Sequence, residues 1–204
     1  LDGADLGRVF AWLRPNDLIW NYWVNNYLMG KNPPSFDVLS WNVDSTNLPA
    51  ALHSDFLEMA VGNSLAQPGK ATCLDTPVDL SKVTCDAFVV GAVTDHITPW
   101  RACYPTVNLL GGKAEFVLSS QGHIQALVNP SGNPKGSFKT NAEAITSDES
   151  LDADEWLAGA TEHKGSWWDH WTAWLADRNG RQVNAPSELG SDAHPATFPA
   201  PGTY

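Results

Sequence analysis

The stretch Val83-Thr-Cys-Asp-Ala-Phe-Val-Val-Gly91, followed by Ala114-Glu-Phe-Val-Leu118, decides the fold. Both segments are almost continuously apolar and rich in β-branched residues, which is typical of strands buried on both faces of a parallel sheet. Between them, residues 100–110 predict a helix that ends at Gly111-Gly112. A strand, a helix and a second strand within about 40 residues predict a βαβ unit and therefore an α/β fold.

The chain before this unit has a helical pattern. Asp17 to Met29 follows the start signal Pro15-Asn16 and predicts a helix that Gly30 ends. A second helix is predicted from Pro49 to Val61, and no two-residue period occurs in the region. Residues 1–69 are therefore interpreted as a mostly helical lobe, and residues 70–204 as the part that contains the sheet.

The chain after the βαβ unit is harder to assign. Residues 131–155 are polar and acidic and predict an exposed loop, and the Pro-, Ala- and Gly-rich residues 180–204 predict an extended surface segment. Trp156 to Leu175 is interpreted as one helix. It carries several of the ten tryptophans of the chain. We expect most of these rings to pack in the interior, although tryptophan also suits a surface that contacts another subunit or a polymer.

Composition excludes several classes of protein. Lys and Arg number 12 against 23 Asp and Glu, giving a net charge of −11, which repels nucleic-acid phosphates. No run of about 18 apolar residues predicts a transmembrane segment. The three cysteines have no CxxC spacing, so we expect neither a disulfide framework nor a zinc site, and a reducing cytoplasm is the expected compartment.

An acid and a histidine follow the two predicted strands. Asp95 comes after the first strand and His123 after the second, with Gly122 allowing a tight turn before the histidine. Functional side chains of open α/β sheets gather beyond the carboxyl ends of the strands. An acid and then a histidine is also the closing order of the α/β-hydrolase triad. On spacing alone, a structural histidine and a catalytic one remain equally open.

Five motifs carry a closer resemblance. They are Leu13-Arg-Pro-Asn-Asp-Leu-Ile-Trp-Asn-Tyr22, Phe36-Asp37 to Trp41-Asn42, Thr94-Asp-His-Ile-Thr-Pro-Trp100, Gly122-His-Ile124 and Gly165-Ser-Trp-Trp168. In this order they resemble motifs of the polyhydroxyalkanoate synthases. The C-terminal Ala-Pro-Gly-Thr-Tyr204 extends the resemblance over nearly the whole chain. The resemblance implies the C-terminal portion of an α/β-hydrolase fold, with residues 1–69 in a helical cap and residues 70–204 in the core and its tail.

The resemblance also assigns roles to residues. Asp95 and His123 correspond to the catalytic aspartate and histidine of the family. His96 belongs to the same motif and is expected to orient or bind substrate, with a structural duty equally open. Trp41 resembles a wall of the substrate pocket, with core packing as the rival interpretation.

The nucleophile of that family is a cysteine in a G-x-C-x-G elbow, which this sequence lacks. Cys73, Cys85 and Cys103 have no flanking glycines for the sharp strand-to-helix turn. Cys85 is expected within the first strand and Cys103 within the following helix, both as small core residues. We therefore expect the nucleophile upstream of residue 1, and the chain to be inactive by itself.

The resemblance implies an acyltransferase that polymerises (R)-3-hydroxyacyl-CoA and releases CoA. The CoA thioester is the substrate, and neither a cofactor nor a metal is implied. The expected partners are the growing polyester, the surface of a polymer granule in the cytoplasm and a second subunit of a homodimer. Two alternatives remain: an esterase or lipase of the same fold with a serine elbow, and a non-catalytic granule-associated fragment.

Overall fold

The computed structural model describes residues 2–33, 47–146 and 150–199. The chain divides into two compact units, one formed by residues 1–85 and 109–112 and the other by residues 86–108 and 113–204. The predicted boundary at residue 69, between a cap and a core, stays a prediction. No helix of the described ranges is both long enough and apolar enough to cross a membrane.

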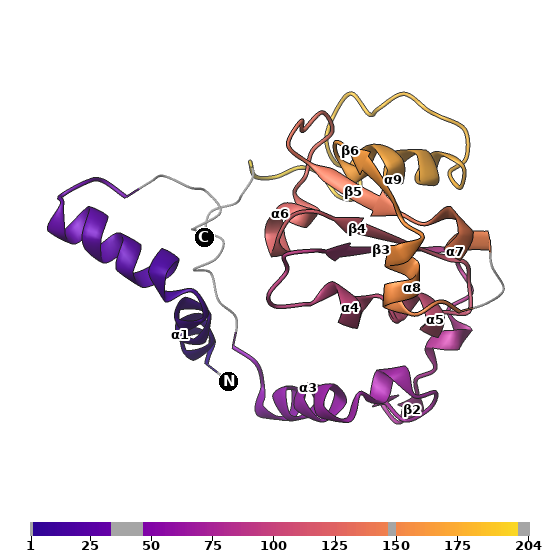
Figure 1. The fold of residues 1–204 in the computed structure, drawn as a ribbon, viewed down its shortest axis with the longest axis horizontal. Helices are drawn as coiled ribbons and strands as arrows, with labels where there is room; N and C mark the ends of the chain where they lie inside the picture. The colour runs from indigo at the N-terminus through magenta and orange to yellow at the C-terminus, as the bar shows by residue number, and fades with distance from the viewer. Residues whose placement is uncertain (1, 34–46, 147–149, 200–204) are drawn as a thin grey trace. The chain divides into compact units, whose positions relative to one another are not determined.

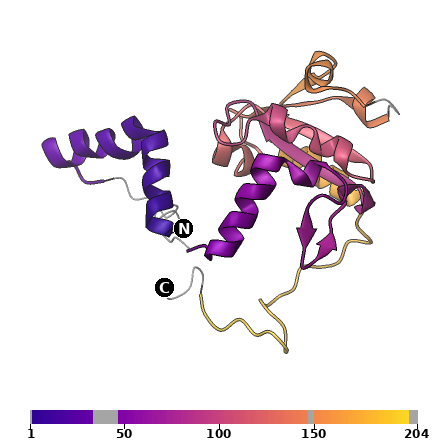
Figure 2. The same ribbon diagram turned by 90° about the horizontal axis from the view of Figure 1, so that it is seen from below.

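The first unit is mainly helical, as its sequence predicts. Its helical segments are α1 (Gly3–Leu13), the π-helical η1 (Asn16–Trp20) and η2 (Trp23–Leu28), α3 (Ala50–Gly62), and the 3₁₀ turns η3 (Ser64–Ala66) and η4 (Leu80–Lys82). The chain bends between α1 and η1 (Figures 1 and 2). Gly30 has a φ of 64°, a left-handed conformation that glycine adopts without steric cost, so the helical stretch ends there.

A small hairpin completes this unit. Strands β1 (Thr72–Cys73) and β2 (Thr76–Pro77) pair in antiparallel fashion (Figure 2). Further along the chain, a Cβ on Gly111 would lie 1.9 Å from the carbonyl oxygen of Ser81, and one on Gly112 would lie 2.2 Å from that of Cys85. These two positions therefore accept glycine alone, which is the physical reason for the Gly-Gly pair in the sequence.

The second unit contains a four-stranded sheet of order β3-β4-β5-β6. Its strands are β3 (Ala87–Ala92), β4 (Ala114–Ser119), β5 (Ser137–Thr140) and β6 (Thr161–Lys164). Strand β3 runs parallel to β4 with Ala87 opposite Ala114, and the other neighbours are antiparallel. The predicted βαβ unit is confirmed. The first strand begins at Ala87 rather than Val83, so Cys85 lies before the strand and is exposed, which corrects its assignment to the core.

The helices of this unit are shorter than the sequence predicts. They are α4 (Trp100–Cys103), α5 (Thr106–Leu109), α6 (His123–Leu127), α7 (Ala142–Thr146), α8 (Ala153–Ala158) and α9 (Trp167–Ala176). The single helix predicted over residues 100–110 is divided at Pro105, which has no N–H to donate and disfavours a helical residue before it.

Two predictions after residue 130 were wrong. Residues 131–155 contain β5, α7 and the start of α8 rather than one exposed loop. The helix predicted from Trp156 to Leu175 is two helices separated by β6. Gly159 ends the first of them and Gly165, with a φ of 99°, precedes the second. The prediction of an exposed segment from residue 180 onward is confirmed over residues 180–199.

The sheet has an apolar cluster on each face, because successive side chains of β4 point to opposite faces and several of them are apolar. Phe116 and Leu118 face a cluster with Trp100 of α4 and Trp156 of α8. Val117 faces the opposite side, where β5 and α9 contribute Phe138 and Trp167. Helices α4 and α8 therefore cover one face and α9 the other (Figure 1).

Candidate active site

The candidate site lies where the two parallel strands end. Asp95 follows β3, and His123 is the first residue of α6, which begins shortly after β4. Pairing continues past the strands, because the amide of Val93 donates to the carbonyl of Ser119 over 2.9 Å. The two connections therefore leave the sheet side by side, and side chains 28 positions apart in sequence come together.

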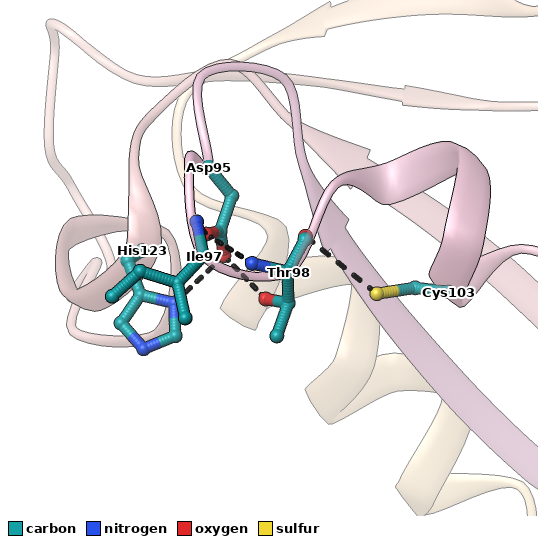
Figure 3. A network of polar contacts seen from close by, with 5 residues as sticks. All are labelled: Asp95, Ile97, Thr98, Cys103 and His123. Atoms are coloured by element: carbon teal, nitrogen blue, oxygen red, sulfur yellow. Dashed lines mark hydrogen bonds and ion pairs between the residues drawn. The ribbon is translucent and has the colours of Figure 1, made fainter. Parts of the chain in front are cut away.

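The structure brings Asp95 and His123 into direct contact. The Nδ1 atom of His123 lies 2.8 Å from Oδ2 of Asp95 (Figure 3). The carboxylate is 6% exposed, whereas the imidazole is 35% exposed. The other ring nitrogen points away from the carboxylate (Figure 3). A buried acid that holds Nδ1 while Nε2 faces outward is the geometry that a general base needs.

Three further hydrogen bonds fix the carboxylate. Oδ1 accepts from the backbone amides of Ile97 and Thr98, each at 2.9 Å, and Oδ2 accepts from the Thr98 hydroxyl at 2.7 Å. Burial alone would raise the pKa of Asp95. The hydrogen bonds, led by the Thr98 amide and the His123 ring, outweigh burial and hold the pKa of this carboxyl well below its usual range. Asp95 is therefore ionised at neutral pH.

A small pocket opens beside the pair. It has a volume of about 90 Å³, and Asp95, Thr98, Cys103 and His123 line it together with small and apolar residues of β3 and α6. Binding pockets for small molecules usually measure about 300–1,000 Å³. The pocket is thus smaller than the usual binding site for a small molecule.

Cys103 is the cysteine nearest to this chemistry. It ends α4, as the prediction of a helical position requires, and its Sγ lies 3.7 Å from the Thr98 carbonyl oxygen, to which it donates. Burial and then the negative charge of Asp95 raise the pKa of the Cys103 thiol. The side chain is therefore a neutral thiol, and Cys103 lacks the activation that a cysteine nucleophile requires.

The structure does not join the other two predicted site residues to the pair within its described ranges. His96 is exposed, and within the described ranges no side-chain hydrogen bond or ion pair links it to Asp95 or His123. Its proposed orienting role stays a prediction. Trp41 lies outside the described residues. Among those residues, no group of three or more His, Cys, Asp or Glu side chains could hold a metal ion.

Sequence reasoning missed Thr98 and the Ile97 amide. The signal was present, because an Asp side chain that accepts from the amides two and three positions later is a common turn. The segment Asp95-His-Ile-Thr98 has that spacing, with a hydroxyl in the third place.

Comparison with known families identifies the family of the chain. The α/β hydrolase fold family matches residues 1–130, and the chain belongs to that family. Over its entire length the chain is also similar to poly(3-hydroxyalkanoate) polymerases, which confirms the resemblance recognised in the sequence.

Three relatives illustrate the similarity. The chain is 51% identical to poly(3-hydroxyalkanoate) polymerase 1 and 52% identical to polymerase 2 of Ectopseudomonas oleovorans, and 44% identical to the poly(3-hydroxyalkanoate) polymerase subunit PhaC of Cupriavidus necator. Each alignment covers 100% of this chain but 36%, 36% and 34% of the relative. The chain thus spans about a third of the length of these relatives.

Proposed function

We propose that this chain supplies the acid and the histidine of a Cys-His-Asp triad in a polyhydroxyalkanoate synthase. The enzyme polymerises (R)-3-hydroxyacyl-CoA and releases CoA, and its cysteine precedes residue 1. The contact between Asp95 and His123 at the carboxyl ends of two parallel strands carries the proposal. The full-length similarity to polymerases supports the choice of substrate.

In this proposal His123 carries out the proton transfers of both half-reactions. Its Nε2 takes the proton of the cysteine thiol, and the sulfur attacks the thioester carbonyl of the substrate. The bond from the acyl carbon to the CoA sulfur breaks, and His123 returns the proton to the departing CoA thiolate. An acyl-enzyme thioester remains. The 3-hydroxyl of another unit then attacks the acyl carbon while His123 accepts its proton. The bond from this carbon to the cysteine sulfur breaks, an oxyester forms, and His123 returns the proton to the cysteine.

Asp95 acts on the ring rather than on the substrate. Its carboxylate selects the tautomer with a proton on Nδ1 and stabilises the imidazolium that forms in each half-reaction. The low pKa of Asp95 suits this role, because the acid stays charged while the histidine gains and loses protons. The cycle exchanges a thioester for an oxyester, so neither a redox cofactor nor a metal takes part.

The surroundings of the site belong to the same proposal. Residues 1–69 serve as the cap of the enzyme and keep water from the acyl-enzyme, because hydrolysis would end chain growth. His96 and Trp41 contribute to substrate orientation and to the pocket wall. The enzyme works as a homodimer at the surface of polymer granules in the cytoplasm.

The test measures CoA release and product together. A full-length protein that contains this chain is given 3-hydroxybutyryl-CoA, beside its His123→Ala variant and the control His194→Ala, which makes the same change at an exposed position. We expect polymer and CoA from the wild type and the control, and a fall of at least about 10³-fold in His123→Ala. Release of CoA with free 3-hydroxybutyrate and no polymer would identify a hydrolase instead. No release by the folded wild type, from this substrate or from a 3-hydroxyacyl-CoA of longer chain, would identify a non-catalytic protein.

A further inference from the structure

Thr98 touches both oxygens of the candidate catalytic carboxylate. Its backbone amide donates to Oδ1 of Asp95 and its hydroxyl donates to Oδ2, at 2.9 and 2.7 Å. We propose that Thr98 is a positioning residue whose hydroxyl controls how Asp95 holds the His123 ring, and with it the pH range in which His123 works as a base. This inference deepens the proposed function and rests on it for its kinetic part.

The two oxygens are held in different ways. Oδ1 is held by two backbone amides, which no side-chain substitution removes. Oδ2 is shared by two side chains, the His123 ring at 2.8 Å and the Thr98 hydroxyl at 2.7 Å (Figure 3). The hydroxyl is therefore the one contact to Oδ2, among the described residues, that competes with His123 for the same charge. The Asp95 carboxylate is only 6% exposed, although Thr98 itself lies at the surface.

Loss of the hydroxyl has two physical consequences. The negative charge on Oδ2 is no longer shared, so its attraction for the imidazolium increases and His123 stays protonated to a higher pH. Oδ2 also loses the contact that fixes its direction, so the Nδ1 hydrogen bond becomes less well aligned. Both effects reduce the fraction of neutral, correctly placed imidazole near neutral pH.

Thr98 is itself held in place. Its carbonyl oxygen accepts from the Cys103 thiol of α4 at 3.7 Å. The next residue, Pro99, precedes the first turn of that helix with a φ of −54°. The segment that carries the hydroxyl is thus hydrogen-bonded to α4 on one side and to Asp95 on the other. A positioning residue must itself be held in place in this way.

The experiment uses the full-length protein with Thr98→Val, which keeps the branched shape and removes the hydroxyl, and Thr98→Ser, which keeps the hydroxyl. Thr172→Val is the matched control, because that hydroxyl donates to the backbone of α9 at Trp168. Diethyl pyrocarbonate acylates neutral imidazole, so mass spectrometry of the His123 peptide across pH reports protonation without turnover. CoA release is measured over the same pH range, and circular dichroism checks folding.

In Thr98→Val we expect the midpoint of His123 modification and the acid limb of CoA release to move up by about one pH unit. CoA release at neutral pH should fall about ten- to a hundredfold, as for a lost hydrogen bond to a charged group. Thr98→Ser and Thr172→Val should match the wild type in both readouts.

If Thr98→Val fails to fold, Thr98→Ala takes its place. Wild-type midpoints in a folded variant without the hydroxyl would overturn the inference. Absence of CoA release from the wild type would refute the proposed function, while the modification midpoints would still decide the role of Thr98.

Discussion

At the scale of single residues, the buried carboxylate of Asp95 determines the candidate site. A carboxylate that is 6% exposed remains ionised only if donors replace the water it has lost. Here two backbone amides, one hydroxyl and one imidazole do so. The same four contacts orient His123 and keep the acid charged, so positioning and electrostatics have one structural origin.

Asp95→Asn should abolish most activity while the fold persists. The amide group is nearly isosteric, but it carries no charge and places an N–H where Asp95 accepts hydrogen bonds, so the histidine tautomer is lost. We expect CoA release to fall on the order of 10³–10⁴-fold. Asp177→Asn, the same change at an exposed position after α9, should keep wild-type release. Near-wild-type turnover in Asp95→Asn would remove Asp95 from the mechanism.

The depressed pKa of Asp95 also makes stability depend on pH. A group with a lower pKa in the folded than in the unfolded state stabilises the fold above its unfolded pKa, about 3.9 for Asp, and this stabilisation is lost as pH falls towards the folded value. The free energy of unfolding of the wild type should therefore exceed that of Asp95→Asn by about 1–3 kcal/mol at pH 7. Urea unfolding should show that the difference shrinks below pH of about 4. A difference that is constant with pH would contradict the linkage.

Cys103→Ala distinguishes a supporting thiol from a nucleophile. Cys103 lines the pocket beside His123, but its raised pKa and its bond to the Thr98 carbonyl indicate a neutral donor. Loss of one weak hydrogen bond costs about 1 kcal/mol or less, so CoA release should fall no more than about fivefold. Cys73→Ala, at an exposed cysteine, is the control. A loss of several orders of magnitude in Cys103→Ala alone would make it the nucleophile.

Asp95 and His123 could be predicted because each follows an apolar run that identifies a strand, and parallel strands end at the same edge of a sheet. The contribution of Thr98 depends on hydrogen-bond directions that spacing does not specify. The role of His96 stays a prediction, because the turn that positions Asp95 leaves the neighbouring His96 exposed.

At the scale of elements, α9 supports the helix that carries His123. The indole Nε1 atoms of Trp167 and Trp168 donate to the carbonyls of Ala126 and Leu127 in the last turn of α6, at 2.6 and 2.9 Å. The Ser166 side chain caps α9 at its N-terminus and also donates to the Asn129 carbonyl. At least two tryptophans of α9 therefore pack against α6 and help to position it.

Trp167→Phe should destabilise the fold through α6. Trp167 is 7% exposed, and the substitution leaves the buried Ala126 carbonyl without its donor while keeping an aromatic ring. We expect a loss of about 1–3 kcal/mol in the free energy of unfolding, measured with urea. Trp171→Phe, at a ring that is 38% exposed, should change it by about 0.5 kcal/mol or less. Equal effects of the two substitutions would exclude this role of the indole hydrogen bond.

The elements also show where sequence patterns lose information. Strands β3 and β4 are long apolar runs and were predicted. Strand β5 is Ser137-Phe-Lys-Thr140, with one buried apolar side chain, and β6 has none. Their pairing depends on tertiary contacts, so a polar segment and an aromatic segment were interpreted as a loop and a helix.

At the scale of the whole molecule, large apolar side chains remain exposed in both units. In the first unit, Trp12 and Tyr27 are 65% and 72% exposed; in the second, Val93 and Ile124 beside the candidate site are 47% and 46% exposed. Strand β3 is also an edge of the sheet in the described part of the chain. Surfaces of this kind usually contact other protein, which agrees with a chain that spans about a third of its relatives.

The 204-residue chain by itself should release no CoA. Beside the acid and the histidine it has a thiol that is held neutral, but it has no G-x-C-x-G or G-x-S-x-G elbow to present a nucleophile to the thioester. Without a nucleophile in these residues no acyl-enzyme forms, so the chain should release no more CoA than its own His123→Ala variant. The purified chain is assayed with 3-hydroxybutyryl-CoA beside the full-length protein, after circular dichroism has verified its folding. Release above that of its own His123→Ala variant would place a nucleophile within these residues and overturn the proposed division of the triad.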